Sequence, residues 1–201
     1  EYERGDELET HAYEWIHTIK PEEIFKMKFD VIIGNPPYQL NTGTSTAQAT
    51  PLYDKFIEQS MKLNPRFLSM IVPSRWFAGG MGLDKFREKM LNDDRIRKIV
   101  DYPNAKDCFS GISIGGGVCY FLWERDSHGL CEFSNVNNNE KSTLLRNLSE
   151  YPIFVRYNNA LSIIHKVDKA SENSLSSIIS SLSPFGIASA ERGSDKKQKN
   201  D

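Results

Sequence analysis

The sequence predicts an α/β fold, in which parallel strands alternate with helices and an antiparallel hairpin ends the sheet. Short β-branched or apolar runs recur between amphipathic segments, which is the pattern of successive strand–helix–strand units. Two of these runs are followed closely by proline, which cannot continue a central strand. A glycine-rich turn comes just before the last run, which indicates the hairpin.

The first half of this pattern starts with a helix expected over residues 12–19 and ended by Pro21. The first strand is expected over residues 29–33, because this continuous β-branched run is typical of a strand buried on both faces of a parallel sheet. An amphipathic helix over residues 52–63 follows, and then a second buried strand over residues 67–72.

The second half begins with the glycine-rich segment 79–82 and a helix over residues 83–91. A third strand is expected over residues 96–102, and a fourth over residues 118–123 is the antiparallel member of the hairpin. The pattern then weakens into polar sequence with a turn expected at residues 135–139.

The composition is that of an ordinary globular protein with room for one sizeable core. The chain has 201 residues, 26% of them charged, and a net charge of -2. This charge argues weakly against a surface that binds duplex nucleic acid, which is usually strongly basic. No stretch reaches the roughly 18 apolar residues of a membrane span, and the acidic N-terminus is unlike a signal peptide, so we expect a cytoplasmic protein without a membrane partner.

No metal site is expected. The three cysteines lack the close spacing of a zinc site, and the four histidines form no ligand pair such as His-Glu-x-x-His. The residues concerned are Cys108, Cys119, Cys131, His11, His17, His128 and His165. We expect the cysteines to be small buried residues near strands.

The tetrad Asn35-Pro36-Pro37-Tyr38 directly follows the first expected strand. Such a tetrad is rare by chance, although Asn-Pro and Pro-Pro are also ordinary turn dipeptides. Its position decides in favour of function, because ligands of open α/β sheets bind beyond the carboxyl ends of the strands. The polar loop 39–51 that follows is of a length and composition often found at functional sites.

The tetrad is similar to the (Asn/Asp)-Pro-Pro-(Tyr/Phe/Trp) motif of methyltransferases that use S-adenosylmethionine to modify planar amino groups. The string FDVIIGNPPYQ, with IVPSRWF, RIRKIVDY and SPFG in order downstream, resembles the N6-adenine-specific DNA methyltransferases of the Eco57I-like restriction-modification family. The resemblance runs from about Lys28 to Gly186. It implies a partial Rossmann-like methyltransferase sheet and methyl transfer to the N6 amino group of adenine in DNA.

In the family that this resemblance implies, the side-chain oxygen of Asn35 and the backbone carbonyl of Pro36 accept hydrogen bonds from the target amine. The lone pair of that amine is delocalised into the ring, so two acceptors that favour a pyramidal nitrogen also stabilise the developing positive charge. Pro36 and Pro37 stiffen the turn, so the carbonyl is aimed in advance. A general base of unusual pKa is then unnecessary.

Aromatic stacking is expected for the target base, which must leave the duplex to reach the methyl donor. Tyr38 is the expected first platform, and the resemblance places Phe109 as the second, although Phe109 could equally be a core aromatic. Arg75, at the end of the second strand, is a candidate for contact with a DNA phosphate. The glycines of residues 79–82 could cradle a phosphate, but a flexible turn is the more common role of such a run.

The resemblance covers only part of what such an enzyme needs. Only 34 residues precede Asn35, too few for the glycine-rich cofactor loop and its strands. Besides Asn35, Asp6 is the candidate for contact with the adenine of S-adenosylmethionine. We therefore expect the chain by itself to bind the cofactor poorly and to methylate nothing.

The expected organisation has four parts. A polar lead-in over residues 1–28 comes before the catalytic half of a methyltransferase domain over residues 29–135. The start of an extension toward a DNA-recognition domain follows over residues 136–187, with a helix near 157–167, and residues 188–201 are a disordered tail. The expected partners are double-stranded DNA with a flipped-out adenine and a fused or separate restriction endonuclease, at the nucleoid of a bacterial cytoplasm.

Two other functions fit the same motif. The tetrad also serves methylation of a protein glutamine amide or of an RNA base, because these amines are planar as well. Alternatively, the chain is a non-catalytic α/β domain in which the tetrad is only a turn.

Overall fold

The computed structural model describes residues 11–40, 50–169 and 179 of the chain. The chain divides into two compact units, residues 1–162 and residues 163–201, and the whole sheet lies in the first unit. Four predictions fall wholly or partly outside the described residues: the role of Asp6, the structure of most of the loop 39–51, the end of the extension beyond residue 169, and the disordered tail 188–201.

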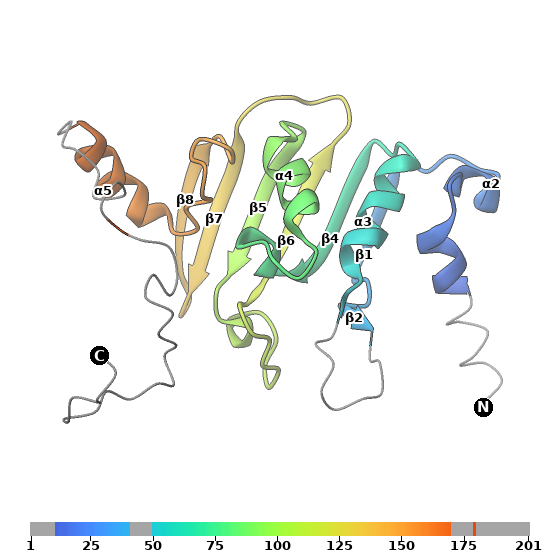
Figure 1. Ribbon diagram of the computed structural model, residues 1–201, viewed down its shortest axis with the longest axis horizontal. Coiled ribbons are helices and arrows are strands. Elements are labelled where there is room, and N and C mark those ends of the chain that lie inside the picture. The colour runs from blue at the N-terminus through green and yellow to red at the C-terminus, as the bar shows by residue number, and fades with distance from the viewer. Residues whose placement is uncertain (1–10, 41–49, 170–178, 180–201) are drawn as a thin grey trace, which may run out of the picture. The chain divides into compact units, whose positions relative to one another are not determined.

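The first unit is built on a six-stranded mixed sheet (Figure 1). The strands β1 and β4 are parallel, and so are β5 and β7, whereas β6 runs antiparallel between β4 and β5, and β8 is antiparallel to β7. In spatial order the strands are β1 (Val31–Gly34), β4 (Phe67–Pro73), β6 (Val118–Glu124), β5 (Ile96–Tyr102), β7 (Cys131–Asn137) and β8 (Glu140–Arg146). The predicted α/β class, with β6 as the antiparallel member, is confirmed. The hairpin of β5 and β6 does not end the sheet, however, because β6 lies between β4 and β5, and β7 and β8 extend the sheet beyond β5.

Short helices and a small second sheet complete the unit. Pro21 begins α2 rather than only ending the helix before it, since proline suits the first turn of a helix. The elements are a helix over residues 11–17, α2 (Pro21–Phe25), α3 (Tyr53–Lys62), α4 (Asp84–Asn92), α5 (Asn158–Lys169, which continues into the second unit), the 3-10 helices η1 (Ser74–Phe77) and η2 (Ala105–Asp107), and the antiparallel strands β2 (Gln39–Leu40) and β3 (Thr50–Pro51).

The hydrophobic core lies between one face of the sheet and the helices α3 and α4, which cover that same face in Figure 1. Alternate residues of β4 and β6 point into the core, as the two-residue period of a strand requires. The helices contribute their apolar stripes. The buried side chains of these elements include Leu68, Val72, Phe121, Trp123, Ile57, Phe86 and Met90.

The strand β1 is not buried on both faces, so that prediction from its β-branched run was wrong. Val31 is 55% exposed and Ile33 is 76% exposed, whereas Ile32 packs against the core. The reason is that β1 is the outermost strand of the described sheet and the helices cover only one of its faces. A continuous apolar run is typical of strands in parallel sheets, but the sequence does not report how many of their faces this chain covers.

The sheet extends beyond residue 135, where the catalytic half was expected to end. Residues 131–146 form the hairpin β7–β8, although their polarity had indicated only a turn. The turn lies at Asn138 and Asn139, which have φ of 49° and 67°. Asparagine tolerates this left-handed conformation, which matches the twist of a tight hairpin.

Candidate functional site

The tetrad lies at the carboxyl end of β1 and lines an open cavity of about 770 Å³. Because β1 and β4 are parallel, the segment that follows β4 reaches the same edge of the sheet and lines the cavity too. The lining residues are Asn35, Pro36, Pro37, Tyr38, Gln39, Pro51, Tyr53, Pro73, Arg75, Met81, Ser113, Ile114 and Gly115. The structure thus brings the whole tetrad and Arg75 together around one cavity.

The tetrad presents its amide to the cavity and buries its first proline. Asn35 is exposed and Pro36 is buried, so the turn is anchored at the proline while the Asn35 side chain is available to a ligand. Since proline fixes its own φ, the backbone of this turn has little freedom once Pro36 is packed. An exposed amide next to a fixed carbonyl can present two oxygen acceptors to one ligand.

Tyr38 is half-buried beside the cavity, and hydrogen bonds hold its carbonyl and the residue that follows it. The Leu52 amide donates to the Tyr38 carbonyl at 3.1 Å, and Gln39 of β2 pairs with Pro51 of β3. These contacts bring the two ends of the loop 41–49 together at the cavity. Burial, with smaller effects from Cys108 and Cys119, raises the pKa of the Tyr38 hydroxyl, so the ring is neutral at physiological pH.

Arg75 contributes a positive charge to the wall formed by η1. Its side chain is exposed, whereas its neighbours Ser74 and Trp76 are buried. The strand β4 and the core contacts of Trp76 therefore hold the backbone of Arg75 while its guanidinium faces solvent and the cavity. A cation in this place favours an anionic group on the ligand.

The glycine-rich turn before β6 forms another wall, through Ser113, Ile114 and Gly115. Gly117 has φ of 81°, and a Cβ atom there would lie 2.6 Å from the Pro103 carbonyl oxygen. Only glycine fits at this position, because the turn packs against the backbone that leaves β5. The sequence had indicated only a hairpin turn here.

Phe109 is partly buried and is not among the residues that line the cavity. It follows η2, and its amide donates to the Ala105 carbonyl at 2.8 Å. The described cavity therefore contains Tyr38 but not the second aromatic ring that was expected opposite to it.

Tyr53 is a cavity residue that the sequence did not single out. It begins α3, is only 2% exposed, and its hydroxyl has no hydrogen-bond partner among the described residues. Burial raises the pKa of this hydroxyl well above its ordinary value. The only sequence signal was its place directly after the polar loop, since helical periodicity counts such a residue as part of the core.

The described residues contain no group of three His, Cys, Asp or Glu side chains that could hold a metal ion. Cys108, Cys119 and Cys131 are free thiols, and Cys119 and Cys131 are buried in the core. Among the helices that the structure describes, none has the length and apolar character needed to cross a membrane.

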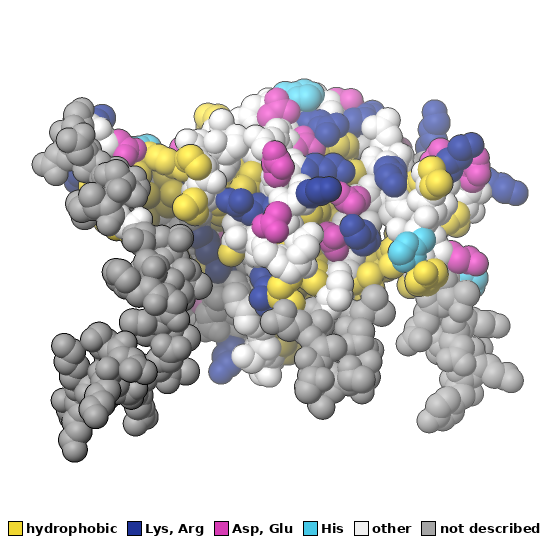
Figure 2. Space-filling view, viewed as in Figure 1, with side chains coloured by type: hydrophobic (Ala, Val, Ile, Leu, Met, Phe, Trp, Pro, Cys, Tyr) yellow, Lys and Arg dark blue, Asp and Glu magenta, His cyan; other side chains and the backbone are white. Residues whose placement is uncertain are grey.

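Charged side chains of both signs are interspersed on the helix-covered face, as Figure 2 shows. On that face the described residues form no continuous basic stripe of the kind that tracks a duplex backbone.

Comparisons with known proteins agree on the class. The model of the Eco57I restriction-modification methylase family matches residues 1–109, more than half of the chain. A protein of Mycoplasma pneumoniae described as an uncharacterized adenine-specific methylase is 37% identical over 131 residues, which are 60% of this chain and 31% of that protein. The chain thus spans about a third of the length of this curated relative.

Solved structures give weaker matches. The methyltransferase subunit of a type I restriction-modification system from Streptococcus thermophilus has 13% identity and a TM-score of 0.39, over 73% of this chain and 33% of that one. The type IIG restriction endonuclease BpuSI has 17% identity and a TM-score of 0.41, over 58% of this chain and 16% of that one. By the extent of the family match, the chain belongs to the Eco57I restriction-modification methylase family.

Proposed function

We propose that this chain forms the amine-binding part of an enzyme that transfers a methyl group from S-adenosylmethionine to the N6 amino group of adenine in DNA, within a restriction-modification system. The observation that carries the proposal is the exposed Asn35 amide, beside the anchored Pro36 and the ring of Tyr38, at the wall of an open cavity. The description of the Mycoplasma relative as an adenine-specific methylase favours adenine over a protein glutamine as the acceptor.

The chemistry assigned to the tetrad is binding and charge stabilisation. The Asn35 side-chain oxygen and the Pro36 carbonyl accept hydrogen bonds from the two N–H groups of the amine. This favours a pyramidal nitrogen whose lone pair would point at the methyl group. As the nitrogen gains the methyl group and the sulfur–methyl bond breaks, the same two oxygens would stabilise the positive charge that develops on nitrogen. Loss of a proton from the nitrogen after the transfer would then remove this charge. The buried proline holds the acceptors in place before the substrate arrives, so little reorganisation is needed during the reaction.

The base reaches this site by leaving the duplex, and Tyr38 is proposed as the ring on which it stacks. Stacking on an aromatic side chain contributes about 1–3 kcal/mol per base, which is comparable with the cost of unstacking. The cavity of about 770 Å³ is large enough for an extruded nucleoside. Arg75 is proposed to contact a phosphate next to the flipped nucleotide, and Phe109, which is outside the described cavity lining, stays the candidate for a second stacking ring.

Only one part of S-adenosylmethionine, the sulfonium with its methyl group, fits the described residues that line the cavity. The ring of Tyr38 and the carbonyl oxygens of the tetrad suit a sulfonium cation. No carboxylate is among the described residues that line the cavity, so recognition of the adenosine part is assigned to groups outside them, Asp6 being the candidate in this chain. When bound, the cofactor supplies the electrophilic methyl group.

The partners proposed for the whole protein are double-stranded DNA and a restriction endonuclease, fused or separate, that cuts unmethylated sites. The proposed enzyme then acts in the bacterial cytoplasm, on the DNA of the nucleoid.

The test is Asn35→Ala in the full-length protein that carries this chain. With labelled S-adenosylmethionine and adenine-containing DNA, we expect a loss of roughly 100- to 1000-fold in kcat, as for removal of an oxyanion-hole donor. DNA binding, measured by fluorescence anisotropy, should change little. Asn92→Ala is the matched control, because Asn92 is an exposed asparagine of α4 that does not line the cavity and whose amide donates to the Glu88 carbonyl within the same helix.

Two outcomes contradict the proposal. An unchanged rate for Asn35→Ala would make the tetrad a structural turn. Preferential methylation of RNA or of a protein glutamine by the wild-type enzyme, assayed in parallel, would keep the chemistry and overturn the substrate.

A further inference from the structure

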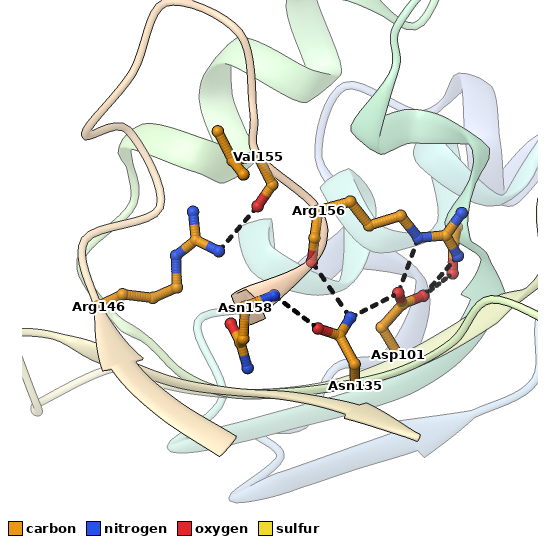
Figure 3. Close-up of polar contacts among 7 residues, drawn as sticks. Asp101, Asn135, Arg146, Val155, Arg156 and Asn158 are labelled. Atoms are coloured by element: carbon orange, nitrogen blue, oxygen red, sulfur yellow. Dashed lines mark hydrogen bonds and ion pairs between the residues drawn. The ribbon is translucent and has the colours of Figure 1, made fainter. Parts of the chain in front are cut away.

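Behind the cavity wall lies a fully buried carboxylate, Asp101 of β5, which is 0% exposed (Figure 3). Both of its oxygens are occupied. Arg156 donates through Nε to Oδ2 and through Nη2 to Oδ1, each at 2.7 Å. The Ser74 hydroxyl donates to Oδ1 at 2.7 Å, and the Asn135 amide nitrogen donates to Oδ2 at 3.2 Å.

A carboxylate in the core is expensive unless it is paired and fully hydrogen-bonded. The two parallel hydrogen bonds from Arg156 satisfy this requirement with a geometry that lysine cannot reproduce. Removing the guanidinium would leave Asp101 with an uncompensated charge, and its remaining donors would have to move or admit water. The position of those donors, Ser74 among them, therefore depends on Arg156.

Ser74 connects this ion pair to two walls of the cavity. It is 1% exposed, and the next residue is Arg75, which lines the cavity. The Ser74 amide donates to the Gly117 carbonyl at 3.0 Å, and the Gly117 amide donates to the Ile114 carbonyl at 3.0 Å. The η1 wall and the wall of residues 113–115 are thus both fastened where Ser74 meets Asp101.

The segment that carries Arg156 is in turn held by hydrogen bonds to residues of β7 and β8. Its backbone carbonyl accepts from the Asn135 amide nitrogen at 3.1 Å, and the Asn135 side-chain oxygen accepts from the Asn158 backbone amide at 3.0 Å. One residue earlier, the Val155 carbonyl accepts from Arg146 of β8 at 2.8 Å. The segment that carries Arg156 is therefore tied to β7 and β8, as Figure 3 shows.

We propose that Arg156 is a positioning residue for the active site: through Asp101 and Ser74 it sets the η1 wall and the 113–115 wall opposite Asn35. The inference rests on the proposed function and adds to it a residue outside the part that the family model matches, residues 1–109. The hairpin β7–β8 then has a function, which is to present Arg156 to the cavity end of β5.

The chain contains a matched control at the opposite end of β5. Arg95 donates through Nε and Nη2 to the two oxygens of Asp93 at 2.7 and 2.8 Å, so the geometry of the pair is the same. Asp93 also accepts from the Trp123 indole at 3.0 Å. Neither residue of this pair lines the cavity.

The experiment uses the full-length protein with Arg156→Gln, Arg156→Lys, Ser74→Ala and Arg95→Gln, each assayed well below its own melting temperature. Arg156→Gln should lower kcat by about 10- to 100-fold, because small misplacements at a reacting centre have effects of this size, and should change the KM for DNA by less than about threefold. Arg156→Lys should recover part of the rate. Arg95→Gln should lower the melting temperature but leave kcat within about twofold of wild type.

A double mutant tests the route through Ser74. If Arg156 acts through Asp101 and Ser74, the double variant Arg156→Gln/Ser74→Ala should be no slower than Arg156→Gln alone, because coupled residues are not additive. Additive losses would overturn the route. Equal kcat for Arg156→Gln and Arg95→Gln would overturn the positioning role and leave a structural ion pair.

Hydrogen exchange separates this inference from the proposed function. Arg156→Gln should speed exchange of the Ser74, Ala78 and Gly117 amides, whereas Arg95→Gln should not. Failure of the wild-type protein to methylate adenine would overturn the proposed function. The hydrogen-exchange rates would still decide whether Arg156 holds the two walls of the cavity. Unchanged exchange at all three amides would overturn the inference.

Discussion

The two ends of the sheet use similar polar residues in opposite ways. At the end where β4 and β5 begin, charged side chains pair with one another, as in Asp93 with Arg95 and Asp94 with His128. At the end where these strands finish, the buried Asp101 is paired with Arg156, and Asn35 and Arg75 line an open cavity. The difference indicates that one end is built to close the fold and the other to bind, and substitutions at either end test it.

After the substitution of Asn35, the largest expected effect at the cavity end belongs to the ring of Tyr38. We predict that Tyr38→Ala lowers methylation of a matched duplex by about 10- to 100-fold, because it removes stacking of about 1–3 kcal/mol from the flipped base. Tyr38→Phe should retain most of the rate, since stacking needs the ring and not the hydroxyl. The defect of Tyr38→Ala should shrink on a duplex with a mismatch at the target adenine, where flipping is easier. An equal defect on both substrates would contradict the stacking role.

The next effect concerns the glycine turn at the cavity end. Gly117→Ala should destabilise the protein strongly, because the added methyl group would meet the Pro103 carbonyl in a backbone conformation that alanine avoids. Each kcal/mol lost should lower Tm by roughly 2–4 °C, as measured by calorimetry. Gly115→Ala is the control for stability, because its φ is ordinary and a Cβ atom there meets nothing within 4 Å. A similar Tm for both variants would contradict the close approach.

At the closed end, the pH dependence of stability should report on Asp93. Burial raises the pKa of Asp93, but hydrogen bonds from Arg95 and Trp123 outweigh it and hold that pKa below its ordinary value of 3.8. A carboxyl whose pKa is lowered on folding stabilises the protein above its ordinary pKa and loses this contribution as the pH falls through the lowered one.

We therefore predict that Asp93→Asn lowers Tm at pH 6, while the difference from wild type narrows as the pH approaches 3. Thermal melts across this range give the measurement. A constant difference between the two proteins at all pH values would argue that the Asp93 charge contributes nothing.

The smallest effect is expected at the surface pair of His128 and Asp94, whose side chains are both largely exposed although their atoms lie 2.8 Å apart. His128→Gln should change stability by no more than about 0.5 kcal/mol, because solvent screens exposed pairs and their ordering has a cost in entropy. Urea denaturation gives the free energy of unfolding. A loss several times larger would mean that this surface pair is part of what closes the end of the sheet.

Local sequence was a good guide wherever neighbouring residues decide the structure. The strands β4, β5 and β6 and the helices α3 and α4 begin and end within two residues of the predicted ranges. Their boundaries are set by Pro73, by the glycine-rich turns and by the apolar periodicity, all of which act over a few residues. The family could be inferred from the sequence as well, and the match to residues 1–109 confirms it.

The walls of the cavity could not be inferred in this way. Arg75 was a candidate because it follows a strand, but Tyr53 and Gly115 come from segments far apart in the chain, and periodicity contains no information about which segments meet. The hairpin β7–β8 was missed because one face of it is exposed and polar, so its apolar signal is weak. The exposed face of β1 was missed because burial depends on the other elements that cover a strand.

By itself, then, the sequence determined the elements from α3 to β6, the family and the tetrad at the end of a strand, because steric and turn preferences act between close neighbours. Only the tertiary structure decided that Asn35 is exposed at a cavity, that Phe109 does not line it, and that Arg156 neutralises Asp101 from a segment 55 positions away. Burial and charge pairing are properties of assembled surfaces, so they exist only once distant segments have come together.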